Sequence, residues 1–299
     1  MAQQSSETIG FIGLGTMGRF MAGNLIRAGF ELVVFDVREQ AIAPLQALGA
    51  GTAANPREVG ARAGTVISML PDTPDVEAVV YGPDGLLSDA PSCRLIVDMS
   101  TIAPGAVRKI SADLAAKGIA FLDAPVSGGP VGAESGTLTI MAGGEEAAFQ
   151  QALPVLRAMG TTITHVGPSG AGQTLKLCNQ LICGINIQAI CEALALARAS
   201  GVDLGILRQV LMGGSAGSWM LDKLGPGMIA RDAHAGFRID LMLKDLKLVQ
   251  ELAFELSVPL PATSLVTSQY LDARSHGEGG NGNQALFAVY DRMAGQAPG

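Results

Sequence analysis

The sequence predicts an α/β domain in its first half, followed by an all-α domain. Up to about residue 166, short apolar runs alternate with helical patterns, whereas from residue 172 onward helical patterns continue without a convincing strand. Solidly apolar strands are typical of parallel sheets covered on both faces, and their alternation with helices is typical of βαβ units. We therefore expect one domain over residues 1–166 and a second over residues 167–299.

The first half contains seven runs that we expect to form strands. They are Ile9–Gly13, Leu32–Phe35, Thr65–Met69, Leu95–Asp98, Ile119–Leu122, Leu138–Ala142 and Thr162–Val166. Helical patterns between them include Met17–Ala28 and Gly105–Lys117.

The second half opens with residues 172–200, which are rich in Leu, Ile and Ala and contain no Pro. We expect one helix here, roughly 40 Å long, that links the two domains. Polar residues interrupt it too often for a membrane span. Further helices are predicted over Leu204–Met212, Trp219–Leu224, Asp240–Leu256, Ala262–Arg274 and Gln284–Met293, with a mobile glycine-rich loop over Ser275–Asn283.

The charge balance bears on the kind of partner. The 299 residues carry a net charge of −7 and no dense Lys/Arg run, which argues against nucleic acid, because phosphates need a basic face. A small anionic substrate stays compatible, since one or two local cations are enough to hold it. We expect no nucleic acid and no membrane partner.

Cysteine and histidine usage bears on metals and compartment. The four cysteines show no CxxC spacing and the three histidines are scattered, so we expect reduced thiols and no metal site. The first residues, MAQQSSET, lack the basic start and the apolar core of a secretion signal. These features predict a cytoplasmic protein.

A glycine motif follows the first predicted strand and opens a helix. Gly13 would allow the tight turn, Gly15 the close approach of a pyrophosphate, and Gly18 the packing of helix on strand. The free N–H groups of that helix would hold the phosphates. A glycine-rich turn of some other α/β protein is the alternative. We expect a Rossmann-type domain whose cofactor-binding residues here are Gly13, Leu14, Gly15, Thr16, Met17 and Gly18.

The second predicted strand leads into Asp36, 18 residues after Gly18. A carboxylate there accepts hydrogen bonds from the adenosine ribose and repels a 2′-phosphate, so NAD is favoured as the cofactor. Arg38 could approach a 2′-phosphate, so NADP is not excluded. The alternative is that Asp36 only caps a turn.

Four segments, in this order, resemble those of the β-hydroxyacid dehydrogenase family, which includes 3-hydroxyisobutyrate dehydrogenases and tartronate semialdehyde (2-hydroxy-3-oxopropionate) reductases. They are IGFIGLGTMG near the start, DAPVSGGPVGAESGTLTIMAGG over Asp123–Gly144, GAGQTLKLCNQ over Gly170–Gln180, and KDL over Lys244–Leu246. The resemblance spans about Ile9 to Leu246. It implies an NAD(P)-dependent enzyme that interconverts a small 3-hydroxy acid and its semialdehyde.

The resemblance also implies roles for particular residues. Lys176 would be the catalytic lysine, and Asn179 would be a second catalytic residue, which lies three residues on, on the same helical face, and can reach the same substrate. The substrate carboxylate would be bound by Ser127, Gly128 and Gly129. Further contacts to the cofactor would come from Leu70, Pro71, Asp75, Thr101 and Lys244, the last of which would also contact substrate.

Carbonyl reduction asks for the same kind of residue on chemical grounds. Hydride transfer to an aldehyde places negative charge on its oxygen, which must receive a proton. With no His or metal constellation, a lysine on a largely apolar helix is a credible acid, and its charge would stabilise the developing alkoxide. The alternative is that Lys176 extends into solvent from a helix end.

The finer substrate prediction comes from the same resemblance. MGGSAGSW, GFRIDLMLKDL and PLPATS look more like tartronate semialdehyde reductases than hydroxyisobutyrate dehydrogenases. We therefore expect NADH-dependent reduction of 2-hydroxy-3-oxopropionate, with 3-hydroxyisobutyrate dehydrogenase or another family member as the alternative. A non-catalytic nucleotide-binding scaffold is the alternative of another class. The helical domains of the family commonly pack together, which predicts a homodimer or homotetramer.

Overall fold

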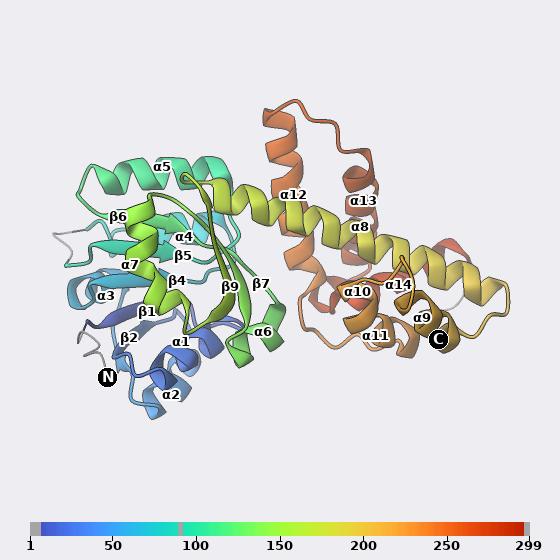
Figure 1. The fold of residues 1–299 in the computed structure, drawn as a ribbon, viewed down its shortest axis with the longest axis horizontal. Helices are drawn as coiled ribbons and strands as arrows, with labels where there is room; N and C mark the ends of the chain where they lie inside the picture. Colours follow the sequence, from blue (N-terminus) through green and yellow to red (C-terminus); the bar gives the residue numbers. More distant parts are fainter. Residues whose placement is uncertain (1–6, 89–91, 296–299) are drawn as a thin grey trace. The chain divides into compact units, whose positions relative to one another are not determined.

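The computed structural model describes residues 7–88 and 92–295. The chain divides into two compact units, Met1–Lys176 and Leu177–Gly299, which are described separately (Figure 1). The domain boundary expected at residues 166 and 167 stays a prediction, since packing divides the chain later, within a long helix. The first six residues, where the sequence indicates no secretion signal, lie outside the described residues.

The first unit is built on a sheet with the strand order β3-β2-β1-β4-β5-β6-β8-β7, and β9 pairs with β8. Neighbours from β3 through β6 are parallel. This doubly wound order confirms the predicted Rossmann-type fold. Within the described residues the strands are β1 Ile9–Ile12, β2 Leu32–Phe35, β3 Gly51–Thr52, β4 Thr65–Ser68, β5 Leu95–Asp98, β6 Ala120–Asp123, β7 Val126–Ser127, β8 Leu138–Gly143 and β9 Gly160–Gly167.

The far edge of the sheet departs from the parallel pattern. Strand β8 is antiparallel to both β6 and β7, while β9 is parallel to β8. The connection from Ser127 to Leu138 contains only the short helix α6 (Gly129–Ser135), and a parallel crossover needs about a dozen residues or more. Strands β3 and β7, of two residues each, are too short to show a periodicity in the sequence.

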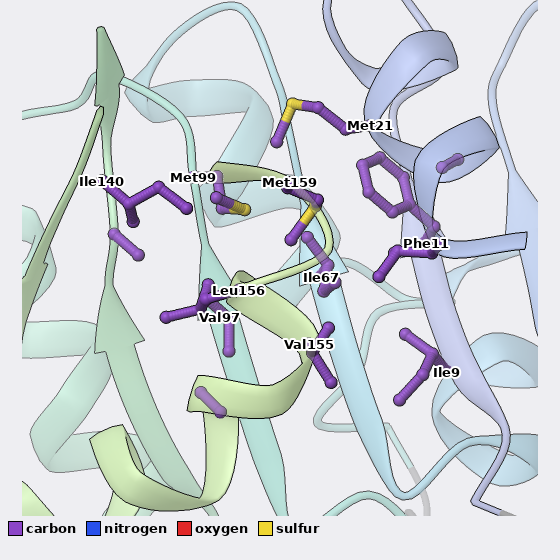
Figure 2. Close-up of a cluster of buried hydrophobic side chains, with 14 of the residues drawn as sticks. Ile9, Phe11, Met21, Ile67, Val97, Met99, Ile140, Val155, Leu156 and Met159 are labelled. Carbon is purple, nitrogen blue, oxygen red and sulfur yellow. The ribbon is translucent and has the colours of Figure 1, made fainter. Parts of the chain in front are cut away.

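Helices cover both faces of this sheet, as Figure 1 shows. On one face, Phe11, Ile67 and Val97 of neighbouring strands pack with Met21 and Leu156 from two helices (Figure 2). On the other face a second apolar cluster joins the strands to three helices. The first face carries α1 (Gly18–Arg27), α2 (Glu39–Ala47), α6 and α7 (Glu146–Leu156), and the second carries α3 (Pro56–Arg62), α4 (Thr73–Tyr81) and α5 (Pro104–Ala115).

The long helix α8 (Ala171–Ala199) begins in the first unit and continues into the second. It is the one helix, among the residues that the structure describes, long and apolar enough to cross a membrane. Its most apolar window has a mean hydropathy of 1.5 and is 44% buried, and apolar core helices pass the same test. Helix α8 is therefore weak evidence for a membrane span.

The second unit is helical, and its described residues contain no strand beyond an isolated bridge between Arg238 and Gly282. Its core includes the fully buried Tyr270 and Phe287. Helix α11 was not predicted. It begins with Gly225, Pro226 and Gly227, and proline is tolerated in the first turn of a helix. The elements are α8, α9 (Leu204–Met212), α10 (Trp219–Lys223), α11 (Gly225–Ala230), α12 (Ile239–Glu255), α13 (Pro261–Ser275), η1 (Glu278–Gly280), η2 (Asn283–Leu286) and α14 (Phe287–Met293).

A buried carboxylate joins three helices of the second unit. Asp291 of α14 is 1% exposed and forms ion pairs with Arg198 near the end of α8 and with Arg231 after α11. Both guanidinium groups also lie over the ring of Phe287, at 5.1 and 4.3 Å from its centre. Removing one partner of such a group would leave buried charge uncompensated.

The glycine-rich segment 275–283, predicted as a mobile loop, is packed in the structure. It contains η1, whose Glu278 pairs with Arg292 at 2.7 Å. Gly279 is buried, and a Cβ there would lie 2.5 Å from the carboxylate of Asp240. A larger residue here would displace the Asp240 side chain of α12, which packs against this segment.

Candidate active site

The predicted cofactor residues follow parallel strands of the first unit. The segment Gly13–Gly18 follows β1, Asp36 follows β2, Leu70 follows β4 and Thr101 follows β5. The carboxyl ends of parallel strands meet at one edge of a sheet, and in open α/β sheets ligands bind outside that edge. The fold thus brings these four groups to one edge.

The three glycines of the loop differ in why they are needed. Gly13 has a φ of +93°, and a Cβ there would lie 2.3 Å from the carbonyl oxygen of Met69. A Cβ at Gly18 would lie 1.9 Å from the carbonyl oxygen of Gly13. At Gly15 the nearest atom is an Arg38 nitrogen, 3.8 Å away. The fold itself requires Gly13 and Gly18, whereas the space beside Gly15 suits a closely approaching phosphate.

The helix that follows this loop also suits an anion. Helix α1 begins at Gly18, and Met17 at its N-cap makes no side-chain hydrogen bond to the first turn. Thr16 is exposed and Leu14 is buried. The first N–H groups of a helix lack intrahelical acceptors, and the helix dipole favours negative charge there. The glycine loop therefore fits the pyrophosphate of a dinucleotide.

Asp36 binds the glycine loop and is covered by Arg38. Its Oδ2 accepts the backbone N–H of Leu14 at 2.7 Å, and its Oδ1 accepts the backbone N–H and the Nε of Arg38 at 2.8 and 3.1 Å. Burial acts to raise the pKa of Asp36, but the hydrogen bonds from Arg38 and Leu14 hold this pKa below its ordinary value. Asp36 is therefore an anion that shapes the loop and whose charge is partly balanced by the half-exposed Arg38.

A second carboxylate, Asp98 at the end of β5, is fully buried. Its Oδ1 accepts the hydroxyl groups of Ser68 and Ser100, at 2.8 and 2.6 Å. The hydroxyl oxygen of Ser100 in turn accepts the backbone N–H of Leu70 at 2.8 Å. These bonds fix the backbone on which Leu70 and the half-buried Thr101 are carried.

A third carboxylate, Asp123 at the end of β6, receives the first turn of α8. Its two oxygens accept the backbone N–H groups of Gly170 and Gln173, each at 2.8 Å. Gly172 packs so closely here that a Cβ would lie 2.6 Å from the carbonyl oxygen of Asp123. Burial raises the pKa of Asp123 to about 6, although both backbone hydrogen bonds act to lower it.

Lys176 lies one turn further along α8 and is 6% exposed. The alternative in which this side chain extends into solvent does not fit that burial. Asn179, predicted to share its helical face, is half-buried and donates to the side-chain oxygen of Gln180 at 2.9 Å. Lys176 is the last residue of the first unit, while Asn179 belongs to the second.

The segment Ser127–Gly129 is a half-buried turn between β7 and α6. Gly128 and Gly129 have φ values of +126° and +61°, and a Cβ on Gly129 would meet nothing within 4 Å. The side-chain amide of Asn24 in α1 donates to the carbonyl oxygen of Ala133 in α6 at 2.7 Å. This bond joins the turn's helix to the helix of the glycine loop.

Two further predicted residues have other partners. Asp75, an exposed residue of α4, accepts the backbone N–H of Asp72 at 3.1 Å and so completes a capping box. Lys244 on α12 pairs with the buried Asp245 at 2.8 Å. Pro71 is exposed at the start of the loop that precedes α4.

Sequence reasoning missed the partners of these residues. The carboxylate of Asp245 accepts the side-chain amide of Gln180 at 2.5 Å, so α8 and α12 are joined beside Lys244. Both residues lie in segments that resemble the family, Asp245 in KDL and Gln180 at the end of GAGQTLKLCNQ. That shared membership was the signal in the sequence that could have pointed to them. Among the residues that the structure describes, His, Cys, Asp and Glu form no cluster suited to a metal ion.

Comparison with known proteins shows which families the two parts of the chain match. Residues 8–167 match the family described as the NAD binding domain of 6-phosphogluconate dehydrogenase. Residues 170–290 match that described as NAD-binding of NADP-dependent 3-hydroxyisobutyrate dehydrogenase. The 2-hydroxy-3-oxopropionate reductase of Escherichia coli is 41% identical, over 96% of this chain and 98% of its own. The 3-hydroxyisobutyrate dehydrogenase of Pseudomonas aeruginosa is 43% identical, over 85% and 88%.

A solved structure agrees over nearly the whole chain. The 3-hydroxyisobutyrate dehydrogenase of Mycobacterium tuberculosis, solved with L-serine, matches with a TM-score of 0.85 and 32% identity, covering 95% of this chain and 98% of that one. The fold and the glycine loop thus define an NAD(P)-dependent dehydrogenase that acts on CH–OH groups. The chain belongs to the β-hydroxyacid dehydrogenase family, as its four segments predicted.

The glycine loop gives a paired prediction. Gly15→Ala should fold with a free energy of unfolding within about 0.5 kcal/mol of the natural protein, but bind NADH about tenfold more weakly or worse, because the new methyl group occupies the phosphate's space. Gly18→Ala should lose about 1–3 kcal/mol of stability, because its methyl group overlaps a backbone carbonyl. Urea unfolding and fluorescence titration with NADH measure the two effects. Natural affinity for NADH in Gly15→Ala would contradict this assignment.

Asp123 gives a prediction for pH. Its pKa is about 6 in the folded protein and 3.8 in its ordinary state, so protonation favours folding. This contribution is fully present below pH 3.8 and is lost as the pH rises through 6. The natural protein should therefore gain up to about 3 kcal/mol over Asp123→Asn between pH 7 and pH 4. Urea unfolding of both proteins across this range measures the difference, and a pH-independent difference would refute it.

Proposed function

We propose that the chain interconverts a small 3-hydroxy acid and its semialdehyde with NAD(H), and that 2-hydroxy-3-oxopropionate is the semialdehyde. The observation that carries the proposal is the burial of Lys176. This lysine lies one helical turn beyond Gln173, whose backbone N–H is hydrogen-bonded to Asp123 at the end of β6. A buried lysine carried by the same edge as the glycine loop is suited to proton transfer at a reacting carbonyl.

The proposed step balances without a further co-reactant. When bound, reduced nicotinamide supplies the hydride that the carbonyl carbon receives. The ammonium group of Lys176 gives a proton to the carbonyl oxygen, so the C=O double bond becomes a CH–OH group and the lysine becomes neutral. Water then returns the proton to Lys176. Before the proton moves, the positive charge of the ammonium stabilises the negative charge that develops on the oxygen.

The substrate's carboxylate would be held by the turn at Ser127, Gly128 and Gly129. The positive φ values of the two glycines give this turn a shape that other residues adopt with strain, and Gly129 leaves open space where a side chain would stand. The Ser127 hydroxyl and the backbone N–H groups can donate to the carboxylate. From the second unit we propose Asn179 as a catalytic residue and Lys244 as a residue that binds both substrate and cofactor. Asp245 partly balances the charge of Lys244.

The choice of substrate comes from the linker GGSAGS between α9 and α10. Residues 213–218 contain no charged side chain. The resemblance implies a more polar, arginine-containing loop in the hydroxyisobutyrate branch, so this loop favours the tartronate semialdehyde reductases. Identity does not separate the branches, because the relatives named for the two activities are 41% and 43% identical. 3-Hydroxyisobutyrate oxidation is therefore the second candidate, and a non-catalytic nucleotide-binding protein is the third.

For the cofactor we propose a preference for NAD, with NADP still accepted. The anionic Asp36 would bind the adenosine ribose hydroxyls and repel a 2′-phosphate, while the Arg38 guanidinium beside it would weaken that repulsion. The remaining cofactor contacts are proposed as they were predicted, at Thr101 and at the loop of Leu70 and Pro71, with Asp75 beyond it.

We further propose a cytoplasmic homodimer or homotetramer. The second unit exposes large apolar side chains on several helices, which supports association between copies. Examples are Leu196, Ile206, Val210, Phe254 and Leu265, which are 54–91% exposed.

One assay tests the chemistry and the substrate together. Rates with NADH on a panel of semialdehydes, and with NAD on the matching 3-hydroxy acids, should give the highest kcat/KM for the 2-hydroxy-3-oxopropionate and glycerate pair. Lys176→Ala should lower kcat by at least about 100-fold with little change in NADH affinity, because it removes the proton donor. Lys247→Ala, which removes an exposed lysine of α12, is the control and should keep natural rates.

Three outcomes of that assay would change the proposal. A higher kcat/KM for hydroxyisobutyrate than for glycerate would reverse the order of the candidates. NADH binding without turnover on any member of the panel would favour the non-catalytic protein. Substantial turnover by Lys176→Ala would remove this lysine from the mechanism.

The cofactor proposal predicts opposite effects of two neighbours. Asp36→Asn keeps an acceptor for Leu14 but loses the charge, so the ratio of kcat/KM for NADH to that for NADPH should fall by about tenfold or more. Arg38→Ala should raise the same ratio, because it leaves the carboxylate unbalanced. Steady-state rates with both cofactors measure the ratios. A shift in the same direction for both variants would show that repulsion by Asp36 does not set the preference.

A further inference from the structure

Gln173 is a fully buried side chain that none of the predicted roles uses. Its Oε1 accepts the backbone N–H of Ile102 at 3.1 Å, and its Nε2 donates to the backbone carbonyl of Ser100 at 2.8 Å. Those two residues flank Thr101. The Gln173 amide thus pairs with the backbone carbonyl before Thr101 and with the backbone N–H after it. Thr101 is the residue that we propose to lie at the nicotinamide end of the cofactor.

The backbone of Gln173 is fixed as firmly as its side chain. Its N–H donates to the buried Asp123 at the end of β6, while Ser100 is bonded to Asp98 at the end of β5. Gln173 therefore connects α8 to two neighbouring strand ends at once. Both polar atoms of the Gln173 side chain have partners, and buried hydrogen bonds of this kind help to fix a single local geometry.

Lys176 lies three residues after Gln173 on the same helix. Residues at this spacing lie on one helical face, with Cβ atoms about 5–6 Å apart. Any rotation or shift of the first turn of α8 relative to Thr101 would therefore also move the lysine. Displacement of a reacting group by about 1 Å can cost about 100-fold in rate.

We propose that Gln173 is a positioning residue that sets Lys176 relative to the Thr101 loop. This inference rests on the proposed function of Lys176 as the proton donor. The side chain suits the task because it is neutral, so it adds no charge beside the lysine, and because it both donates and accepts. Neither a methionine nor an ionised glutamate can replace both bonds.

The test uses Gln173→Met in the full-length protein, with the substrate that gives the highest rate in the panel. We expect kcat to fall by about 10- to 100-fold, with the Kd for NADH within twofold of the natural value. The solvent isotope effect on kcat should rise, because proton transfer becomes slower. Gln188→Met is the control and should keep natural kcat, because it removes another buried glutamine of α8 whose side-chain amide donates to Glu192 of the same helix.

A second variant keeps the test decisive if Gln173→Met folds poorly. Protonated glutamate donates and accepts like glutamine, so the kcat of Gln173→Glu relative to the natural protein should rise as the pH falls. The proposal would be overturned if the relative kcat of Gln173→Glu did not change with pH. It would also be overturned if the kcat of Gln173→Met fell only in proportion to the fraction of protein that no longer binds NADH. Natural kcat in Gln173→Met would overturn it as well.

Lys176→Ala, assayed in parallel, separates the positioning role of Gln173 from the proton-donor role of Lys176. If Lys176→Ala is inactive while Gln173→Met has natural kcat, the positioning role fails and the proton donor stands. If Lys176→Ala retains turnover, the proposed function fails, and the inference about Gln173 fails with it.

Discussion

Three buried carboxylates, each at the carboxyl end of a parallel strand, hold the candidate site together. Asp36 binds the glycine loop, Asp98 binds the end of β4 and the loop after β5, and Asp123 binds the start of α8. Buried charges are costly unless they are hydrogen-bonded, so each carboxylate draws backbone N–H or hydroxyl groups toward it. The positions of these loops relative to one another follow from that requirement.

The electrostatics of these carboxylates differ although their surroundings are similar in kind. An arginine beside Asp36 helps to hold its pKa below the ordinary value, whereas burial raises the pKa of Asp123, whose two oxygens accept backbone N–H groups. Asp36 therefore presents a fixed negative charge beside the glycine loop, where we propose that the adenosine ribose binds. Asp123 is a helix anchor whose protonation state depends on its burial. Buried carboxylates at strand ends thus fix both the glycine loop and the start of α8.

The sequence predicted those features that depend on local pattern. The strands from β1 to β6 that exceed two residues, the glycine loop and the long helix α8 all follow from periodicity and from glycine spacing. The network of Asp98, Asp123 and Gln173 could not be predicted in this way, because all but one of its side-chain bonds described above, that from Ser100 to Asp98, join residues 30 to 73 positions apart in sequence. The antiparallel direction of β8 could not be predicted either, because it depends on the short length of the connection through α6.

The unequal demands on the loop glycines have a consequence for evolution within this family. Two of them are fixed by collisions inside the polypeptide, so any descendant that still folds must keep them, whether or not it still binds a dinucleotide. Only Gly15 is free of such collisions. A relative that retains Gly13 and Gly18 but carries a bulky residue in place of Gly15 is thus expected to keep the fold while having lost dinucleotide binding.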